Sequence, residues 1–456
     1  MLKFNRHIKT ILTCLLVGVF TICGQTSAVS AQDAGAGFPI SLNSMVLFAL
    51  HENPDINLLK AREEQAYHSI DEKKSEYYPQ VTLDIDGGRE FNSPSSGGAV
   101  NGSSGTTNTG GIKLSLSQMV FDGFKTSHEV ASRKKLTEAS DFRTKAGVES
   151  VINETVENYL KALRYQNDIA VLQDLLIDVE RTVKTIEELF EAGAAGKVML
   201  DYANSRLAFS TTELNRAQSS LNDAISNLEF LAGKLPPDFI ALPPEELSPN
   251  KLDMQYYLKA VNESNHQVLA SATEVDAMED TLKAEKGKYM PEVNFNLLAD
   301  QSHNDGGQIG TVREISAKLR LSYKLFDGGK RNAAVKRLRS QVNELESKKQ
   351  QIAKDIRRDV KLAYNQIDAN RSALILTDVE ISSNLAQTKL NEENFKLGNI
   401  NVIELIESNE RLKDAKLKKN RLNYEMYFNA YSLLVLTNIL KKEYFCETCL
   451  PAKNPI

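Results

Sequence analysis

The string Leu-Phe-Asp-Gly at residues 325–328 repeats the string Val-Phe-Asp-Gly at residues 120–123, 205 positions earlier. At the same offset, Phe190 matches Phe395 and Gly193 matches Gly398. No insertion or deletion is needed from position 120 to position 207. Such constancy indicates that length itself is constrained, as it would be if two helices had to run side by side between two fixed planes. The chain is therefore a tandem duplication.

A second set of matches lies upstream, at an offset of 212 positions. Residues 78–81, Tyr-Pro-Gln-Val, match residues 290–293, Met-Pro-Glu-Val, and residues 53–56 match residues 265–268. The two offsets differ by seven residues. The repeats therefore differ in the length of one loop, which lies between these matches and the Phe-Asp-Gly strings.

The duplication and the composition divide the chain into five segments. Residues 234–252 contain five prolines, which cannot continue a helix, so we expect a linker that wraps outside the helices. The expected segments are a signal peptide at 1–31, a first repeat at 32–233, the proline-rich linker at 234–252, a second repeat at 253–440 and a C-terminal tail at 441–456.

The first 31 residues have the three-part pattern of a secretory signal peptide. Three basic residues precede an apolar run at 11–20, and small residues end at Ala31, so the mature chain is expected to begin at Gln32. The alternative, an uncleaved membrane anchor, is disfavoured because a helix needs about 20 apolar residues to span a bilayer. Export narrows the location to the periplasm, the outer membrane or the outside.

Apolar and polar residues alternate in two stretches of each repeat, which predicts half-buried strands. The expected strands are about 80–91 and 112–121 in the first repeat and about 292–301 and 313–325 in the second. Residues 92–111 are rich in Gly, Ser, Thr and Asn and indicate a long surface loop.

Each predicted strand reaches the length of about 9 to 11 residues with which a tilted strand crosses an outer membrane, and its alternation suits lipid on one side and water on the other. The alternative is a pair of soluble hairpins. Four strands cannot close a barrel, since the smallest known have about 8. Three copies of the chain would supply twelve.

Long helices follow the second strand of each repeat. The absence of proline and apolar spacings of three and four predict amphipathic helices at about 124–190 and 329–395, each roughly 100 Å long. Shorter helices, stacked end to end in pairs alongside the long ones, are expected at roughly 54–77, 199–231, 265–289 and 404–436.

These residues resemble the TolC family of outer-membrane efflux and secretion proteins. The resemblance rests on the paired hairpins, the strings at 78–81 and 325–330, and Gly398 followed by Val-Ile-Glu-Leu-Ile-Glu at 402–407, and it covers nearly all of residues 40–440. It implies a mainly α fold with transmembrane β, made of two tandem repeats of helix, β-hairpin, long helix and helix. Three chains would form a trimeric 12-stranded β-barrel continuous with a 12-helix periplasmic α-barrel.

The resemblance also assigns residues at the strand ends. It places Pro79, Phe121, Pro291 and Phe326 at the periplasmic face of the membrane, where aromatic rings form an interfacial girdle. The alternative for the two phenylalanines is ordinary packing against helices.

The opposite end of the helices is expected to form a narrowed tip. Gly193 and Gly398 would be its turns, and Glu404 and Glu407 match the acidic pair with which the family lines its entrance. Three copies would form two stacked rings of negative charge that hold cations and set selectivity. The alternative is that Glu407 pairs with Arg411 one turn further on, an exposed contact that contributes little.

The resemblance implies a channel-tunnel in the outer membrane of a Gram-negative bacterium that exports substrates from the periplasm or from an inner-membrane pump. Its partners would be a periplasmic adaptor, or membrane fusion, protein and an inner-membrane ABC or proton-driven exporter, in a tripartite efflux or a type I secretion system. The alternative is a non-conducting periplasmic coiled-coil adaptor, which has no need of the alternating strands. The cargo stays open.

Other classes of function find little support. A formal net charge of −5, from 55 basic and 60 acidic residues, gives no electrostatic case for nucleic acid. The sequence has no His-Glu-x-x-His, Gly-x-Ser-x-Gly or phosphate-loop motif, so we expect no enzyme, no cofactor and no metal site. Cys446 and Cys449 are candidates for a local disulfide, since a zinc site would need two further ligands.

Overall fold

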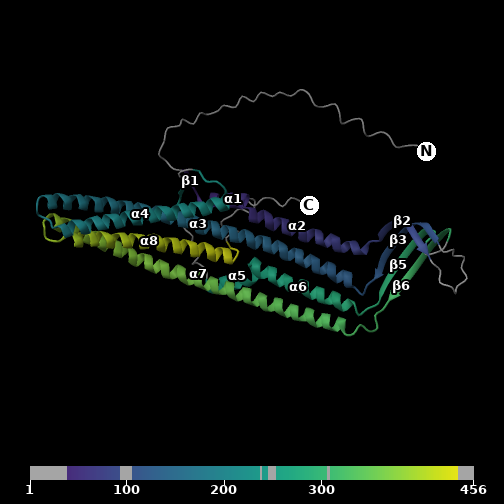
Figure 1. Ribbon diagram of the computed structural model, residues 1–456. Coiled ribbons are helices and arrows are strands. Elements are labelled where there is room, and N and C mark those ends of the chain that lie inside the picture. Colours follow the sequence, from purple (N-terminus) through teal and green to yellow (C-terminus); the bar gives the residue numbers. More distant parts are fainter. Residues whose placement is uncertain (1–37, 93–104, 237–238, 245–252, 306–308, 440–456) are drawn as a thin grey trace, which may run out of the picture.

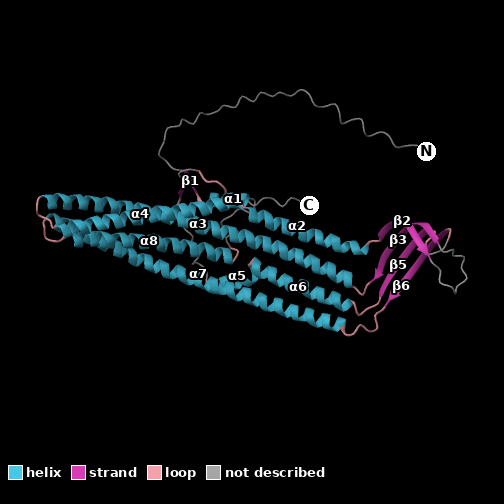
Figure 2. Cartoon of the chain, viewed as in Figure 1, coloured by secondary structure: helices cyan, strands magenta, loops and turns pink. Residues whose placement is uncertain are grey.

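The chain forms an elongated body with a four-stranded sheet at one end (Figure 1). At the other end, one turn connects α3 (Lys125–Glu191) to α4 (Lys197–Ala232) and another connects α7 (Lys330–Lys396) to α8 (Val402–Leu436). The computed structural model describes residues 38–92, 105–236, 239–244, 253–305 and 309–439. The predicted signal peptide and tail, with Cys446 and Cys449, lie outside these residues. Helix predominates (Figure 2), which confirms the expected mainly α fold.

Two long helices run the length of the helical part. α3 (Lys125–Glu191) and α7 (Lys330–Lys396) each contain 67 residues. At about 1.5 Å per residue, each is about 100 Å long. Within the described ranges, no helix has a segment both long enough and apolar enough to cross a membrane.

The repeated Phe-Asp-Gly string starts each long helix. Asp122 accepts a hydrogen bond from the backbone amide of Thr126 at 2.7 Å, and this satisfies an amide that the first turn leaves without a partner. Asp327 accepts the amide of Arg331 at 3.0 Å in the same way. The glycine after each aspartate has a positive φ, which glycine adopts without a steric penalty. The duplicated motif is therefore a helix start.

Each long helix lies beside a column of two shorter helices (Figure 1). α2 (Pro54–Lys74) and α4 (Lys197–Ala232) form the column beside α3, and α6 (His266–Gly287) and α8 (Val402–Leu436) form the column beside α7. α3 also packs against α6 and α8. The order across the body is therefore α2/α4, α3, α6/α8 and α7.

Two further helices were not predicted from the sequence. α1 (Leu42–Glu52) precedes α2, and α5 (Met254–Ser264) precedes α6. Each has 11 residues and is separated from the next helix by an asparagine in the extended conformation, which caps the helix that follows. Segments this short depend on tertiary packing for their stability, so local pattern alone indicates them poorly.

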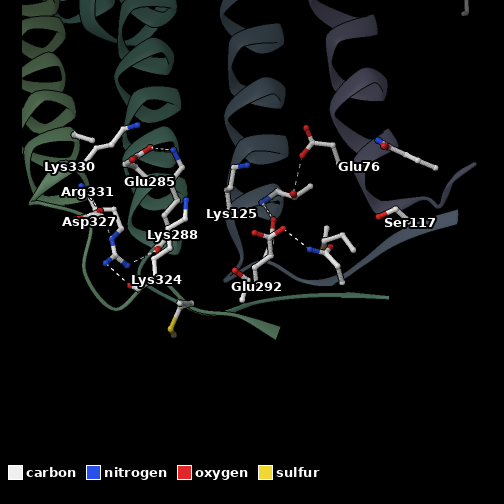
Figure 3. A pocket seen from close by; sticks show the side chains of 18 of the residues that line it. Glu76, Ser117, Lys125, Glu285, Lys288, Glu292, Lys324, Asp327, Lys330 and Arg331 are labelled. Atoms are coloured by element: carbon white, nitrogen blue, oxygen red, sulfur yellow. Dashed lines mark hydrogen bonds and ion pairs between the residues drawn. The ribbon is translucent and has the colours of Figure 1, made fainter. Parts of the chain in front are cut away.

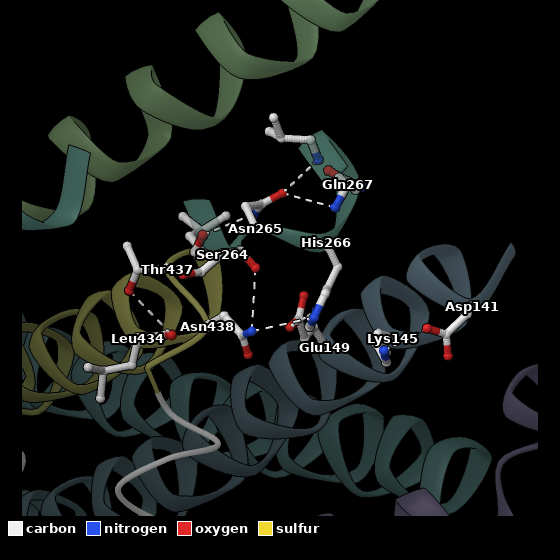
Figure 4. Close-up of polar contacts among 12 residues, drawn as sticks. Asp141, Lys145, Glu149, Ser264, Asn265, His266, Gln267, Leu434, Thr437 and Asn438 are labelled. Carbon is white, nitrogen blue, oxygen red and sulfur yellow. Dashed lines mark hydrogen bonds and ion pairs between the residues drawn. The ribbon is translucent and has the colours of Figure 1, made fainter. Parts of the chain in front are cut away.

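Asn265 joins the two helices of the second column end to end (Figure 4). Its side-chain oxygen accepts two backbone amides at the start of α6, at 3.0 and 3.1 Å, while its Nδ2 donates to the carbonyl oxygen of Leu436, the last residue of α8, at 2.9 Å. Beside it, His266 Nδ1 lies 2.6 Å from Glu149 Oε1 on α3. The matching Asn53 also caps its helix, but its Nδ2 is buried with no hydrogen-bond partner among the described residues.

The sheet is antiparallel, and its strands lie in the order β2, β3, β5, β6. Their bounds are β2 (Gln80–Asn92), β3 (Gly105–Phe121), β5 (Glu292–His303) and β6 (Thr311–Ser322).

Two strand boundaries differ from the prediction by three residues or more. β3 begins at Gly105 rather than at 112, because the backbone of residues 105–111 pairs with β2 and such pairing requires no apolar side chain. β6 ends at Ser322 rather than at 325, because Ser322 pairs with Glu292, the first residue of β5. The preceding Pro291 has no N–H with which to extend the ladder.

The main apolar core lies at mid-length of the helices, where a small parallel sheet packs against α3. Its strands, β1 (Phe38–Ile40) and β4 (Phe239–Ala241), were not predicted. The hydroxyl of the buried Tyr159 lies 2.7 Å from the carbonyl oxygen of Ile40 and accepts the amide of Leu242 at 2.8 Å. Burial raises the pKa of Tyr159 to about 12. The described part of the proline-rich linker is therefore tied to α3.

Candidate functional site

One face of the sheet is apolar and exposed. The strand register places alternate residues of all four strands on this face, and in the isolated chain several are almost as accessible as in an extended peptide, with Ile315 at 85% and Ile85 at 70%. The face consists of Val81, Leu83, Ile85, Ile112, Leu114, Leu116, Val293, Phe295, Leu297, Ala299, Ile315, Ala317, Leu319 and Leu321. An exposed apolar surface of this extent indicates contact with lipid or with protein.

The opposite face of the sheet is polar. One continuous row of paired residues crosses all four strands as Asp84, Lys113, Asp300 and Glu314. The neighbouring rows consist mainly of Ser, Thr, Asn, Gln and charged residues such as Lys318, with Leu298 and Val312 as apolar exceptions. Water on this side and hydrocarbon on the other satisfy both faces.

The sheet and the helical part each end, on the same two sides of the body, in elements that lack a neighbour. In the sheet, β2 and β6 each pair along one side only. In the helical part, the column α2/α4 and the helix α7 are the outermost elements. α7 also exposes Leu362, Ile375, Leu376 and Val379, each with more than half of its surface accessible. Unpaired backbone and exposed apolar side chains thus occur together along the edge formed by β6 and α7.

The residues predicted at the strand ends do lie near the junction of sheet and helices, but not all at strand ends. Pro79 and Pro291 each precede the first residue of a strand, and Phe121 is the last residue of β3. Phe121 packs edge to face on Phe124, with ring centroids 5.5 Å apart. Phe326 lies beyond the end of β6 and is 88% exposed, because the ladder stops at Ser322.

A charged hollow of about 540 Å³ lies at this junction, on the polar side of the sheet (Figure 3). Arg331 forms hydrogen bonds to three of the residues that line this hollow. The guanidinium donates to Asp327 Oδ2 at 2.8 Å, to the carbonyl oxygen of Lys324 at 2.8 Å and to that of Lys288 at 3.2 Å. It also lies over the ring of Tyr289, 4.9 Å from the centroid. Sequence patterns missed this contact; its only local signal was the Asp-Arg pair spaced i, i+4.

Gly193 and Gly398 form the turns at the far end of the helices. Each has a φ of 74°, and each donates its amide to the carbonyl oxygen three residues back, at 2.9 and 3.0 Å. The left-handed conformation after a helix is the usual C-terminal cap for glycine. A Cβ at either position would meet nothing within 4 Å, so both turns are exposed.

Glu404 and Glu407 lie on the first turns of α8, next to this end. The side chain of Asn401 accepts the amide of Glu404 at 3.0 Å, which starts the helix. Both glutamates are exposed, and Glu407 Oε2 lies 3.9 Å from Arg411 Nη1. Arg411 is the alternative partner of Glu407 that the sequence indicated. A half-exposed ion pair at this distance contributes little to stability. Glu404 forms no ion pair within the described residues.

Polar pairs that the sequence did not indicate link α8 to the first repeat. Arg206 pairs with Glu410 at 3.2 Å, and Lys413 pairs with Glu213 at 3.0 Å. The Lys413 side chain is only 7% exposed. Burial lowers the pKa of Lys413, but the hydrogen bond and charge of Glu213 outweigh it, and the net pKa is raised. These pairs hold the two helical hairpins against each other near the tip.

A sheet with one apolar and one polar face, joined to columns of helices and open at matching edges, defines the class of membrane-channel subunits that carry a helical extension. A family model described as "Outer membrane efflux protein" matches residues 48–234 and 258–438. The chain belongs to the outer membrane efflux protein family, and is an outer-membrane protein with a large periplasmic part.

Individual relatives are distant but similar over most of their length. The chain is 20% identical to the outer membrane efflux protein BepC of Brucella suis biovar 1 (strain 1330), over 92% of this chain and 91% of that protein. It is 22% identical to the outer membrane protein TolC of Escherichia coli (strain K12), over 86% and 83%. The fold resembles that of the CmeC outer membrane channel of Campylobacter jejuni, with a TM-score of 0.78 at 16% identity over 87% of this chain and 85% of that one.

Proposed function

We propose that three copies of this chain close side by side into an outer-membrane channel-tunnel that exports substrates to the outside of the cell. The observation that carries the proposal is the coincidence of open edges: β2 and β6 in the sheet continue into α2/α4 and α7 in the helical part. Joining β6 of one chain to β2 of the next pairs the backbone groups that hydrocarbon would otherwise leave unsatisfied. Twelve strands would then form the wall.

The exposed faces agree with this assembly. With the apolar face of the sheet turned outward, lipid covers Val81, Ile85, Ile315 and their neighbours, while the row that includes Asp84 and Glu314 faces water inside. The bare apolar side chains of α7 would pack on the α2/α4 column of the neighbouring chain. A non-conducting coiled-coil adaptor would not account for the exposed apolar face of the sheet.

The partners proposed are a periplasmic adaptor protein and an inner-membrane ABC or proton-driven exporter, within a tripartite efflux or type I secretion system. Membership of the efflux family supports this assignment. We place adaptor contact at the helices flanking Gly193 and Gly398, and entry of cargo past Glu404 and Glu407. In this proposal, residues 1–31 direct export and are removed.

The test is to express the chain in a Gram-negative host and to purify it from outer membranes in detergent. Native mass spectrometry should give the mass of three chains that begin at Gln32, and planar bilayers should show discrete conductance steps. A mature product that stays monomeric and soluble without detergent, or a trimer that never conducts, would refute the channel.

A further inference from the structure

Two arginines interrupt the apolar face of the sheet at its end remote from the helices. Arg89 on β2 is in step with Val81, Leu83 and Ile85, and Arg313 on β6 is in step with the apolar residues from Ile315 to Leu321. Alternate residues of a strand point to the same side, so both arginines share the apolar face. Both are exposed.

The two arginines lie equally far along their strands from the junction with the helices. Arg89 follows Gln80, the first residue of β2, by nine residues, and Arg313 precedes Ser322, the last residue of β6, by nine residues. At about 3.3 Å per residue, this is about 30 Å along the strand, or about 21 to 24 Å of height for strands tilted by 35–45°. An apolar band is about 25 Å tall, so the arginines lie at its outer boundary.

The arginines also belong to the two edge strands of the sheet. In the trimer on which this inference rests, β6 of one chain lies beside β2 of the next. Arg313 of one chain and Arg89 of its neighbour then face the lipid on the two sides of one seam. The same arrangement recurs at each seam between chains.

Each guanidinium is held by an amide of the neighbouring strand. Arg89 Nε donates to Asn108 Oδ1 at 3.1 Å, and Arg313 Nε donates to Gln301 Oε1 at 3.0 Å. Within the described ranges, neither arginine forms an ion pair with a carboxylate. The terminal nitrogens of both side chains are thus available to an acceptor outside the sheet. A lone positive charge facing hydrocarbon is unfavourable, and a negative partner at the headgroup level offsets this.

We propose that each seam between chains binds the phosphate of an anionic outer-leaflet lipid, held by Arg89 of one chain and Arg313 of the next. Guanidinium groups donate two parallel hydrogen bonds to phosphate oxygens, which makes arginine suited to this ligand. A lipid that bridges two chains strengthens the trimer, because it binds the assembled form and not the separate chains.

The experiment measures the temperature at which the detergent-solubilised trimer dissociates, in micelles doped with phosphatidic acid or with phosphatidylcholine. Phosphatidic acid should raise this temperature for the wild type by several degrees, and phosphatidylcholine should not. The double variant Arg89→Gln/Arg313→Gln should lose most of the shift. Arg320→Gln is the matched control: it removes an exposed arginine from the polar face of β6, and the shift should be unchanged.

Further arms separate the possible outcomes. Arg89→Lys/Arg313→Lys keeps the charges and should retain part of the shift, which covers the case in which the glutamine variant fails to assemble. Inorganic phosphate at the same concentration should have no effect. An equal shift in the double glutamine variant, an equal loss in Arg320→Gln or an equal effect of inorganic phosphate would overturn the lipid site. A wild type that neither trimerises nor conducts would instead refute the channel itself.

Discussion

The backbones of Gly123 and Gly287 touch: a Cβ on Gly123 would lie 2.3 Å from the carbonyl oxygen of Gly287. The contact presses the loop between β3 and α3 against the end of α6, at the junction of sheet and helices. Gly328, the matching residue of the second repeat, has the same left-handed φ but nothing within 4 Å of its Cβ position. The duplicated glycine therefore has two different roles.

This difference predicts unequal effects of the same substitution. Gly328→Ala should lower stability by about 1–2 kcal/mol, the penalty for a left-handed alanine. Gly123→Ala should lower it by clearly more, because the new methyl group must also displace backbone at Gly287. Thermal dissociation of the purified trimers, followed by circular dichroism, gives both values. Equal losses for the two variants would contradict the close contact.

The two capping asparagines offer a second matched pair. Asn265→Asp keeps the cap of α6 but replaces the amide that donates to the carbonyl oxygen of Leu436, and should cost about 1–3 kcal/mol. Asn53→Asp should cost less, since its amide has no partner among the described residues to lose and aspartate caps equally well. Chemical unfolding of the two variants in one detergent would measure this, and an equal loss would argue against the Asn265 joint.

Lys413 should contribute more than an exposed lysine on the same helix. Lys413→Met leaves Glu213 without its partner and should cost about 1–3 kcal/mol, less than a fully buried pair because Glu213 is partly exposed. The control is Lys418→Met, which breaks an exposed pair with Glu380 and should cost about 0–1 kcal/mol. The free energy of unfolding of each variant is measured against the wild type. A loss for Lys418→Met as large as that for Lys413→Met would contradict the prediction.

The Lys413 pair also predicts a pH dependence. Because the pKa of Lys413 is raised above its ordinary value of 10.5 in the folded chain, its stabilising contribution is complete below pH 10.5 and is lost as pH rises through the folded pKa. Wild type and Lys413→Met should therefore differ in stability by a constant amount from neutral pH to about pH 10 and converge above it. A difference that widens above pH 10.5 would show that the sign is wrong.

Removal of the acidic residues at the tip should change ion selectivity. If Glu404 and Glu407 of three chains face one entrance, Glu404→Gln/Glu407→Gln should lower the ratio of cation to anion permeability several-fold and weaken block by divalent cations. Glu344→Gln, an exposed glutamate on α7 far from the tip, is the control. Reversal potentials in a salt gradient across planar bilayers report the ratio. Unchanged selectivity in the double variant would remove the assignment to rings.

The overall fold could be predicted because its signals are local. Alternation with period two and apolar spacing of three and four follow from how side chains leave a strand or a helix, and each is legible within a dozen residues. The duplication added the constraint of equal length. The family comparison confirms the class, and α3 and α7 both have 67 residues.

The candidate site was predicted less completely, because it depends on contacts between distant residues. Asn265 and Leu436 are 171 positions apart, and Lys413 and Glu213 are 200 apart. Nothing in either neighbourhood of the sequence identifies the other partner. That Arg89 and Arg313 lie equally far along their strands from the helices likewise follows only from the bounds of the strands.

The sequence by itself determined the long helices, the four strands of the sheet and the apolar face of each of these strands, because these properties arise from neighbours along the chain. Only the tertiary structure decided which elements remain without partners at the edges, how the two columns of helices are joined, and where the apolar face ends. Those features depend on the free energy of packing segments that the chain brings together only when it folds.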